Sequence, residues 1–376
     1  MIKNASKTNL IFIRVDSSSQ IGSGHVERCL TLAKELRERG MEISFISRAH
    51  IGNFKNQIKN AGFKIFMLPL NNNSIKKNDH KSWLGVKWQK DAKDTIKILS
   101  KKKLMLLIVD HYAIDINWEN YVKLLTGVKI MVIDGLANRR HNCEILLDYT
   151  YSQKGKKRWD KLIPSNCMLL QGTKYILLRS EFVQAKKNLY TRKGEIKRIL
   201  IAFGGSKNKN ATMTALNALL SLKKDKVFVD VVVSKNFEDI NMVKKICNIK
   251  ENTKLHVQSS NIAYLMSKAD LSIGAGGTML WERCYLGLPS LIISTANNQI
   301  KQSLAIHSYG AAIYLGSYKK NIKQKLLEQL SILFKNKKLN SLMSQKSFEL
   351  MEISRKKNNN SNPTKFLCNT LLKKMK

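Results

Sequence analysis

Short apolar runs of strand length alternate with segments of helical spacing along nearly the whole chain. Val26–Arg39, for example, places apolar side chains three and four residues apart and stops at Gly40. The strands predicted in the first half are Leu10–Val15, Glu42–Ser47, Phe63–Leu68, Leu104–Val109 and Lys129–Ile133. This alternation is typical of an α/β fold with a parallel sheet.

A second series of the same kind begins near Arg198. Its predicted strands are Arg198–Phe203, Val227–Val233, Lys254–Val257, Leu271–Ile273 and Ser290–Ile293. Its predicted helices are Ala211–Leu220, Phe237–Cys247, Ile262–Lys268 and Thr278–Leu286. The pattern therefore indicates two similar open sheets in tandem.

The length of 376 residues agrees with two domains, since one domain takes about 100–200 residues. The boundary is predicted in Lys186–Glu195, which is basic and loses apolar periodicity. We therefore expect one Rossmann-like domain at 1–185, a second at 196–355 and a basic C-terminal helix at 356–376.

Several other segments have a distinct character. Asn71–His80 is predicted as a polar loop, Trp83–Leu99 as a helix and Lys356–Asn362 as a hinge or surface loop. The lysine-rich C-terminal part predicts helices at Lys320–Phe334, Ser341–Ser354 and Pro363–Lys374.

The charge of the chain is strongly positive: 66 Lys and Arg against 27 Asp and Glu leave a formal net charge of +39. A nucleic-acid-binding protein would concentrate these residues in a stripe interleaved with aromatics, whereas here they are spread over the whole sequence. We interpret the excess as background surface charge with some attraction for an anionic substrate, and keep nucleic-acid binding as an alternative.

The sequence lacks the signals of a membrane or disulfide protein. Its apolar runs fall short of the ~20 residues of a membrane helix, and Met1–Asn9 has no apolar core of a secretory signal. The six cysteines are scattered without paired spacing, so neither a disulfide framework nor a zinc site is predicted. We expect a cytoplasmic protein.

The first glycine loop follows the strand Leu10–Val15 and ends in a histidine. Gly22 and Gly24 allow close approach of a phosphate to the backbone, and His25 lies in the first turn of the next helix. The positive end of the helix dipole disfavours imidazolium, so His25 is a candidate general base, with a polar capping role as the alternative.

Two further glycine loops follow strands of the second series. They are Gly204–Gly205 and Gly274–Gly277, the second followed by Thr278, and together they are suited to a diphosphate. Glu282 lies five residues after Gly277, where its carboxylate can accept hydrogen bonds from a ribose diol; an exposed first-turn carboxylate is the alternative. Neither loop is a Walker A sequence.

Other polar groups follow predicted strands and have turn formation as their default role. They are Asp110-His111-Tyr112, Asp134-Gly135 and Asn297-Asn298-Gln299. Because parallel strands of one sheet end at the same edge, His25 and Tyr112 are expected near the same substrate.

These motifs resemble a known family. IFIRVDSSSQIGSGHVERCLTLAKELRERG, VDHYAIDINWE, VIDGLANRRHNCEILLDYTYS and SSNIAYLMSKADLSIGAGGTMLWERCYLGLPSLIISTANNQ are similar to the UDP-2,4-diacetamido-2,4,6-trideoxy-β-L-altropyranose hydrolases of pseudaminic acid biosynthesis, a route that supplies flagellin glycosylation. The matching segments run from about Ile11 to Gln299.

The resemblance implies two Rossmann-like domains facing across a cleft, the glycosyltransferase-B architecture. It implies hydrolysis of the anomeric C–O bond with inversion and release of UDP, without a metal or cofactor. His25 matches the catalytic base, and Tyr112 and Asn298 match other active-site positions. Glu282 and the Gly274–Gly277 loop match the UDP-binding region, and Lys186 or Lys187 is expected at the phosphates.

The predicted partners are a small UDP-sugar and water, with neither nucleic acid nor membrane. A UDP-sugar glycosyltransferase of the same architecture is the alternative enzyme, because transfer to an acceptor would use the same fold. The sequence leaves the oligomeric state open.

Overall fold

The computed structural model describes residues 8–70, 79–100, 102–204, 209–222, 224, 226–235, 237–258, 261–319, 321–351 and 362–375. The chain divides into two compact units. The first comprises 1–150, 154–177 and 363–376, and the second comprises 151–153 and 178–362. The change from one unit to the other at 177/178 comes earlier than the predicted boundary at 186–195.

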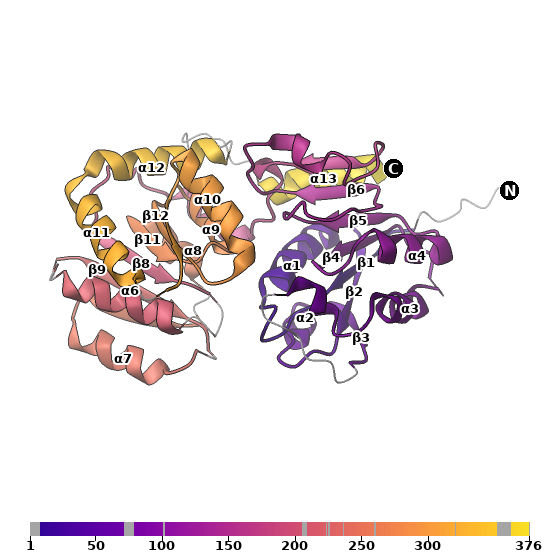
Figure 1. Ribbon diagram of the computed structural model, residues 1–376, viewed down its shortest axis with the longest axis horizontal. Helices are drawn as coiled ribbons and strands as arrows, with labels where there is room; N and C mark the ends of the chain where they lie inside the picture. The colour runs from indigo at the N-terminus through magenta and orange to yellow at the C-terminus, as the bar shows by residue number, and fades with distance from the viewer. Residues whose placement is uncertain are drawn as a thin grey trace. The chain divides into compact units, whose positions relative to one another are not determined.

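The first unit is built on a seven-stranded parallel sheet of order β3-β2-β1-β4-β5-β6-β7 (Figure 1). Its strands are β1 (Leu10–Val15), β2 (Glu42–Arg48), β3 (Lys64–Leu68), β4 (Leu106–Asp110), β5 (Ile130–Ile133), β6 (Ile145–Asp148) and β7 (Met168–Gln171). Its α-helices are α1 (Gly24–Arg37), α2 (Lys55–Asn60), α3 (Trp88–Leu99), α4 (Ile116–Thr126) and α13 (Pro363–Met375). Short 3-10 helices lie at η1 (His80–Leu84), η2 (Gly155–Trp159) and η3 (Thr173–Tyr175).

The second unit has a six-stranded parallel sheet of order β10-β9-β8-β11-β12-β13. Its strands are β8 (Arg198–Ala202), β9 (Phe228–Val233), β10 (Thr253–Val257), β11 (Leu271–Gly274), β12 (Ser290–Ser294) and β13 (Ile313–Ser317). Its helices are α5 (Ser180–Lys187), α6 (Lys209–Ser221), α7 (Ile240–Ile249), α8 (Ile262–Lys268), α9 (Thr278–Tyr285), η4 (Asn297–Gln299), α10 (Ile300–Tyr309), α11 (Ile322–Lys335) and α12 (Lys337–Leu350).

The central strands of both sheets, such as β4 and β12, are buried along their whole length, as continuous apolar strands require. Phe12, Leu107 and Trp118 belong to one core of the first unit, while Ile201, Val231 and Ile273 belong to the core of the second. The strands therefore act as rigid supports whose carboxyl ends carry the polar loops.

The C-terminal helix α13 belongs to the first unit, although the chain reaches it from the second. Figure 1 shows this yellow helix among the magenta elements of the first unit, and Thr364 Oγ1 donates to the carbonyl of Ile176 at 3.4 Å. The basic helix predicted as a separate C-terminal segment thus completes the first unit.

The helix predicted at Trp83–Leu99 is divided in the structure. Trp83 lies in η1, and α3 begins only at Trp88. Gly85 separates the two with a φ of 67°, a left-handed conformation that ends the turn. The start of the helix was therefore predicted wrongly by five residues.

Some predictions concern residues that lie outside the described part of the chain. Residues 71–78 of the predicted polar loop and 356–361 of the predicted hinge belong there, as do Gly205, Lys320 and Ser354. The remaining parts of those predicted helices correspond to α11 and α12.

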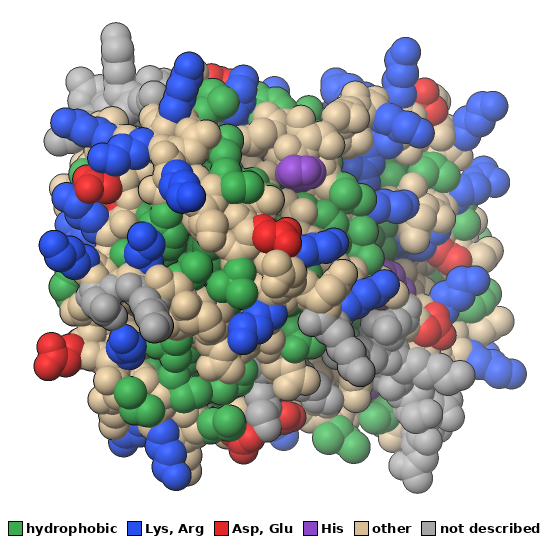
Figure 2. All heavy atoms as spheres, turned by 60° about the vertical axis from the view of Figure 1, so that its left-hand side comes forward, with side chains coloured by type: hydrophobic (Ala, Val, Ile, Leu, Met, Phe, Trp, Pro, Cys, Tyr) green, Lys and Arg blue, Asp and Glu red, His purple; other side chains and the backbone are tan. Residues whose placement is uncertain are grey.

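The basic side chains are dispersed on the surface. On the face shown in Figure 2, Lys and Arg are interspersed with polar and hydrophobic side chains instead of gathering over one element. This distribution agrees with background surface charge.

Candidate functional site

The polar residues of the first unit gather at the carboxyl edge of its sheet. The neighbouring strands β1 and β4 end at Val15 and Asp110, and α1 begins at Gly24. The rings of His25 and Tyr112 meet edge to face, with centroids 4.7 Å apart. The structure thus brings together these two predicted residues.

A buried carboxylate holds His25. Asp110 Oδ1 lies 2.6 Å from His25 Nδ1, and Arg28 Nε donates to Asp110 Oδ2 at 2.5 Å. Burial by itself would raise the pKa of Asp110, but Arg28 and His25 hold that pKa well below its usual range. Arg28 Nη2 also lies 3.0 Å from His25 Nδ1. Because an ionised carboxylate can only accept, a neutral imidazole that donates to Asp110 carries its proton on Nδ1, and its Nε2 then keeps a lone pair for a substrate proton.

Tyr112 completes this group as a hydrogen-bond donor. Burial is the main factor that raises the pKa of Tyr112, to about 12, so its hydroxyl is protonated at neutral pH. The guanidinium groups of Arg28 and Arg139 each lie 5.8 Å from the centre of its ring. A protonated phenol in this position can orient a sugar hydroxyl or amide oxygen.

Two aromatic residues of η1 adjoin His25 and were not predicted as site residues. The rings of Trp83 and His25 meet edge to face with centroids 5.8 Å apart, and the ring centroids of His80 and Tyr112 are 5.1 Å apart. Burial lowers the pKa of His80, and the nearby His25 and Arg139 add to this effect. His80 and Trp83 could have been noticed as aromatic residues in a polar segment. They were not predicted as site residues because one was assigned to a loop and the other to a helix.

The first glycine loop satisfies most of its own backbone groups. Gly22 N–H donates to the carbonyl of Ser18 at 2.8 Å, and the N–H groups of Gln20 and Ile21 donate to Ser18 Oγ, both at 3.0 Å. These N–H groups are engaged within the loop. The loop turns the chain from β1 into α1 and sets the position of His25.

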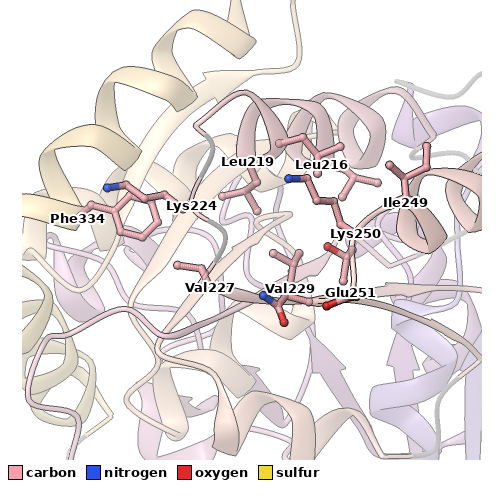
Figure 3. A pocket seen from close by; sticks show the side chains of 12 residues that line it. Leu216, Leu219, Lys224, Val227, Val229, Ile249, Lys250, Glu251 and Phe334 are labelled. Carbon is pink, nitrogen blue, oxygen red and sulfur yellow. The ribbon is translucent and has the colours of Figure 1, made fainter.

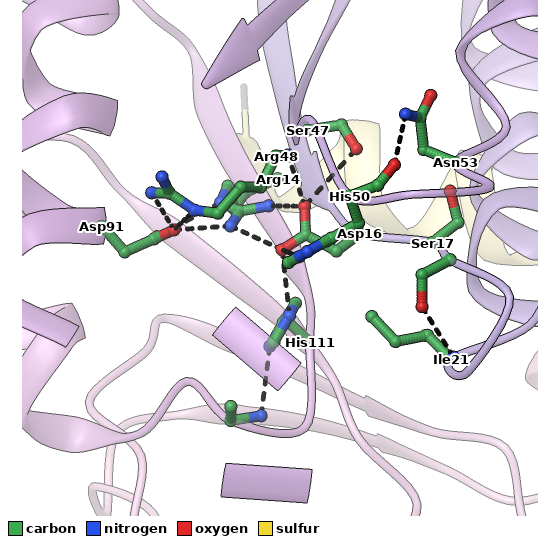
Figure 4. Close-up of polar contacts among 12 residues, drawn as sticks. Arg14, Asp16, Ser17, Ile21, Ser47, Arg48, His50, Asn53, Asp91 and His111 are labelled. Carbon is green, nitrogen blue, oxygen red and sulfur yellow. Dashed lines mark hydrogen bonds and ion pairs between the residues drawn. The ribbon is translucent and has the colours of Figure 1, made fainter. Parts of the chain in front are cut away.

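A buried ionic network anchors the start of that loop (Figure 4). Arg14 Nη2 donates to both Asp16 Oδ2, at 2.8 Å, and Asp91 Oδ2, at 2.7 Å. His111 Nε2 lies 3.1 Å from Asp16, and the backbone N–H of Arg48 donates to Asp16 at 2.7 Å. Burial opposes ionisation of Asp16, yet Arg14 and the histidines keep its pKa well below the usual value. The network ties the carboxyl ends of β1, β2 and β4 together.

His141 forms a second ionic support near the end of β5. Its Nδ1 lies 2.6 Å from Glu119 Oε1 and its Nε2 lies 3.2 Å from Asp134 Oδ2. Burial opposes the charged imidazole, but these two carboxylates raise the pKa of His141 to about 9. The charged ring therefore links α4 to the loop after β5.

This pair of contacts predicts a pH-dependent stability. Because the pKa of His141 is raised, its ion pairs contribute fully to the free energy of unfolding below about pH 6.5, and this contribution is lost as the pH rises through 9. We expect the stability advantage of the wild type over His141→Gln to fall by roughly 3 kcal/mol across that range, measured by denaturant unfolding at each pH. His307→Gln, at an exposed histidine, is the control; an equal pH dependence in both variants would contradict the assignment.

In the second unit, the glycine loop after β11 packs against α10 and leads into α9. A Cβ on Gly276 would lie 2.1 Å from Ser303 Oγ, so only glycine fits there without a shift. Gly277 is the N-cap of α9 and Thr278 its first residue, and no side chain caps this end. The backbone N–H groups of the first turn can therefore receive an anion.

Glu282 is buried, with 3% of its surface exposed, which excludes the alternative of a solvent-exposed carboxylate. Arg179 Nε donates to Glu282 Oε1 at 2.9 Å, and Arg179 Nη1 lies 2.9 Å from Glu181. Arg179 directly precedes α5 and was not predicted, because the basic residue was expected after the Ser180-Glu181-Phe182 segment.

The other predicted residues of the second unit occupy separate places. Gly204 follows β8 with a φ of 65°, and Asn298 lies half-buried in η4 after β12. Lys187 is exposed, whereas Lys186 Nζ lies 5.2 Å from the ring centre of Tyr285, the last residue of α9. Burial lowers the pKa of Lys186. This end of α9 is about 10 Å along the helix from its N-terminus.

A cavity of about 320 Å³ in the second unit lies elsewhere. Figure 3 shows it lined by apolar side chains such as Leu219, Val229 and Phe334. Val229 is near the start of β9 and Thr253 begins β10, so the cavity lies at the amino edge of the sheet. None of the predicted site residues lines it.

Among the described residues, no group of three or more His, Cys, Asp or Glu side chains is arranged to hold a metal ion. No helix within those ranges is long and apolar enough to span a bilayer.

Sequence comparison finds known proteins that are similar to this chain. Residues 199–359 match the glycosyltransferase family 28 C-terminal domain. The chain is 28% identical over 289 residues to the UDP-2,4-diacetamido-2,4,6-trideoxy-β-L-altropyranose hydrolase of Campylobacter jejuni, across 77% of this chain and 93% of that protein. The predicted resemblance is confirmed.

Two other relatives extend the comparison. The spore coat polysaccharide biosynthesis protein SpsG of Bacillus subtilis is 28% identical over 221 residues, which cover 58% of this chain and 64% of that protein. The crystal structure of MurG from Acinetobacter baumannii superposes with a TM-score of 0.62 at 14% identity, covering 97% of this chain and 99% of that one. The fold is therefore the predicted glycosyltransferase-B type, with two parallel-sheet α/β units.

Proposed function

We propose that this protein hydrolyses UDP-2,4-diacetamido-2,4,6-trideoxy-β-L-altropyranose to UDP and the free sugar, with inversion, as a step in pseudaminic acid biosynthesis. The observation that carries the proposal is the pairing of His25 Nδ1 with ionised Asp110 at 2.6 Å, which leaves Nε2 to accept a proton. The similarity to a relative that bears the name of this hydrolase supports the choice of substrate.

In this proposal the second unit holds the nucleotide. The backbone N–H groups at the start of α9, after Gly277, receive the diphosphate, and Thr278 adds its hydroxyl. The carboxylate of Glu282, held by Arg179, accepts hydrogen bonds from the ribose diol. Gly204 and Asn298 lie at the carboxyl ends of β8 and β12, on the same sheet edge.

In this proposal the residues of the first unit carry out the hydrolysis. His25 Nε2 accepts a proton from a water molecule as the water oxygen attacks the anomeric carbon on the face opposite the UDP. The anomeric C–O bond breaks, the electron pair leaves with the diphosphate oxygen, and His25 then returns its proton to solvent. Tyr112 orients the sugar through its protonated hydroxyl, and the leaving group needs no acid because its charge spreads over the phosphate oxygens.

The simplest test is incubation of the purified protein with the UDP-sugar alone. We expect catalytic UDP release without any acceptor, and a proton NMR time course in which the first sugar product has the inverted anomeric configuration. UDP release that requires an added acceptor would replace the hydrolase with the second candidate, a UDP-sugar glycosyltransferase. The family 28 domain at residues 199–359 is the observation that favours that candidate.

Glu282→Gln tests the nucleotide site. Because hydrogen bonds to a charged group contribute about 1.5–3 kcal/mol, we expect UDP to bind roughly 10- to 100-fold more weakly. Isothermal titration with UDP measures this. Glu328→Gln is a matched control, because Glu328 lies on α11 and its carboxylate accepts from Gln324 at 3.0 Å. Equal UDP affinity in both variants would remove Glu282 from the site.

A further inference from the structure

Arg283 is a fully buried cation beneath the Gly274–Gly277 loop. It has no exposed surface, and its Nη2 donates to the carbonyl of Ala275 at 2.5 Å. Within the described part of the chain, its Nε and Nη1 have no hydrogen-bond partner and no carboxylate lies within ion-pair distance. A buried charge without a counter-ion is costly, so its retention calls for an explanation.

Other buried arginines of this protein are compensated. Arg14 and Arg48 are paired with Asp91, and Arg28 is paired with Asp110. Arg192 lacks a carboxylate, but its guanidinium donates to several carbonyl oxygens, including those of Ala269 at 2.8 Å and Met266 at 2.9 Å. Arg283 differs from all of these.

The guanidinium lies directly against the loop. A Cβ placed on Gly274 would be 2.1 Å from Arg283 Nη1, so the absence of a side chain at Gly274 lets the guanidinium pack against the loop backbone. Glu282, the adjacent acidic residue, already accepts a hydrogen bond from Arg179. Burial lowers the pKa of Arg283 to about 10 and outweighs the opposing effect of Cys284 and Glu282, so the group still carries its charge at neutral pH.

We propose that Arg283 is the buried counter-charge for an anionic diphosphate bound at the start of α9, acting through the Gly274–Gly277 loop without touching the ligand. The inference rests on the proposed function for its ligand, a nucleoside diphosphate. Arg283 has two effects. It fixes the orientation of the loop by donating to the Ala275 carbonyl. Its positive charge adds to the positive end of the α9 dipole, and both attract an anion bound at the start of that helix. Arg283 is a positioning residue.

The test compares charge-dependent and charge-independent binding. We expect Arg283→Met to weaken binding of UDP and of inorganic pyrophosphate by roughly 10- to 100-fold, and of uridine by less than about threefold. Its thermal unfolding midpoint should equal or exceed that of the wild type, because an uncompensated buried charge has been removed. Arg283→Lys should retain most of the pyrophosphate affinity.

Arg192→Met is the matched control for a structural arginine. It removes the guanidinium donor from five backbone carbonyls, so we expect a lower unfolding midpoint and unchanged pyrophosphate affinity. If Arg283→Met binds pyrophosphate as the wild type does, or loses uridine and pyrophosphate binding by the same factor, the counter-charge role is wrong. If Arg283→Met does not fold, an Arg283→Lys protein with pyrophosphate affinity reduced more than tenfold would likewise contradict it.

Failure of the two proposals can be told apart. A wild type that binds pyrophosphate but does not act on the UDP-sugar would refute the proposed hydrolase and leave the counter-charge intact. A wild type that binds neither UDP nor pyrophosphate would refute both.

Discussion

His25→Ala is expected to lower kcat by roughly 10²- to 10⁴-fold while leaving UDP affinity unchanged. In the proposed mechanism His25 Nε2 accepts the water proton, and the residues proposed to bind UDP belong to the other unit. Steady-state UDP release gives kcat, and isothermal titration gives the UDP dissociation constant. Because the ring is almost buried, the unfolding midpoint is measured alongside to separate lost chemistry from lost stability.

A surface histidine separates the loss of the catalytic group from a general effect of removing a histidine. His307→Ala is the matched control because His307 is exposed in the second unit. A His25→Ala protein with near-normal turnover would overturn the role of His25.

Asp110→Asn is expected to lower kcat by roughly 10²- to 10⁴-fold, again with little change in UDP affinity. The amide can donate its own N–H to Nδ1, which moves the imidazole proton to Nε2 and removes the lone pair that the proposed mechanism requires. The same substitution leaves Arg28 without its ionised partner, so a lower unfolding midpoint is also expected.

A split between kcat and KM distinguishes this positioning role from general damage. We expect the change in kcat to exceed the change in KM by at least tenfold. Asp115→Asn is a suitable control, because Asp115 caps α4 through the N–H of Asn117 and asparagine caps a helix equally well. If Asp110→Asn keeps wild-type kcat, His25 is not oriented by Asp110.

The elements with clear periodicity or long apolar runs were predictable from the sequence. α1 and most strands of both sheets lie within a few residues of their predicted places. The strands β6, β7 and β13 were missed, because runs of four or five residues have no period that separates them from a loop. The equally short β5 and β11 were predicted because they continue the strand–helix alternation of their units. The split at Gly85 was missed because helical spacing continues through it.

The candidate site was predictable in its parts but not in its contacts. His25 follows a glycine loop at a helix start, and Tyr112 follows a strand, so each could be found locally. The pairing of His25 with Asp110 joins residues 85 positions apart and depends on β1 lying next to β4, an order that hydrophobic patterning does not encode. The proposed roles of Arg179 and Arg283 likewise depend on contacts, with Glu282 and with the Ala275 carbonyl, that are visible only in the structure.

Hydrolysis in oxygen-18 water tests the central claim most directly. If His25 activates water for attack at the anomeric carbon, the UDP released during turnover of the UDP-sugar carries no oxygen-18, and mass spectrometry finds UDP of ordinary mass. UDP that has gained one oxygen-18 atom would show cleavage at phosphorus and contradict the account.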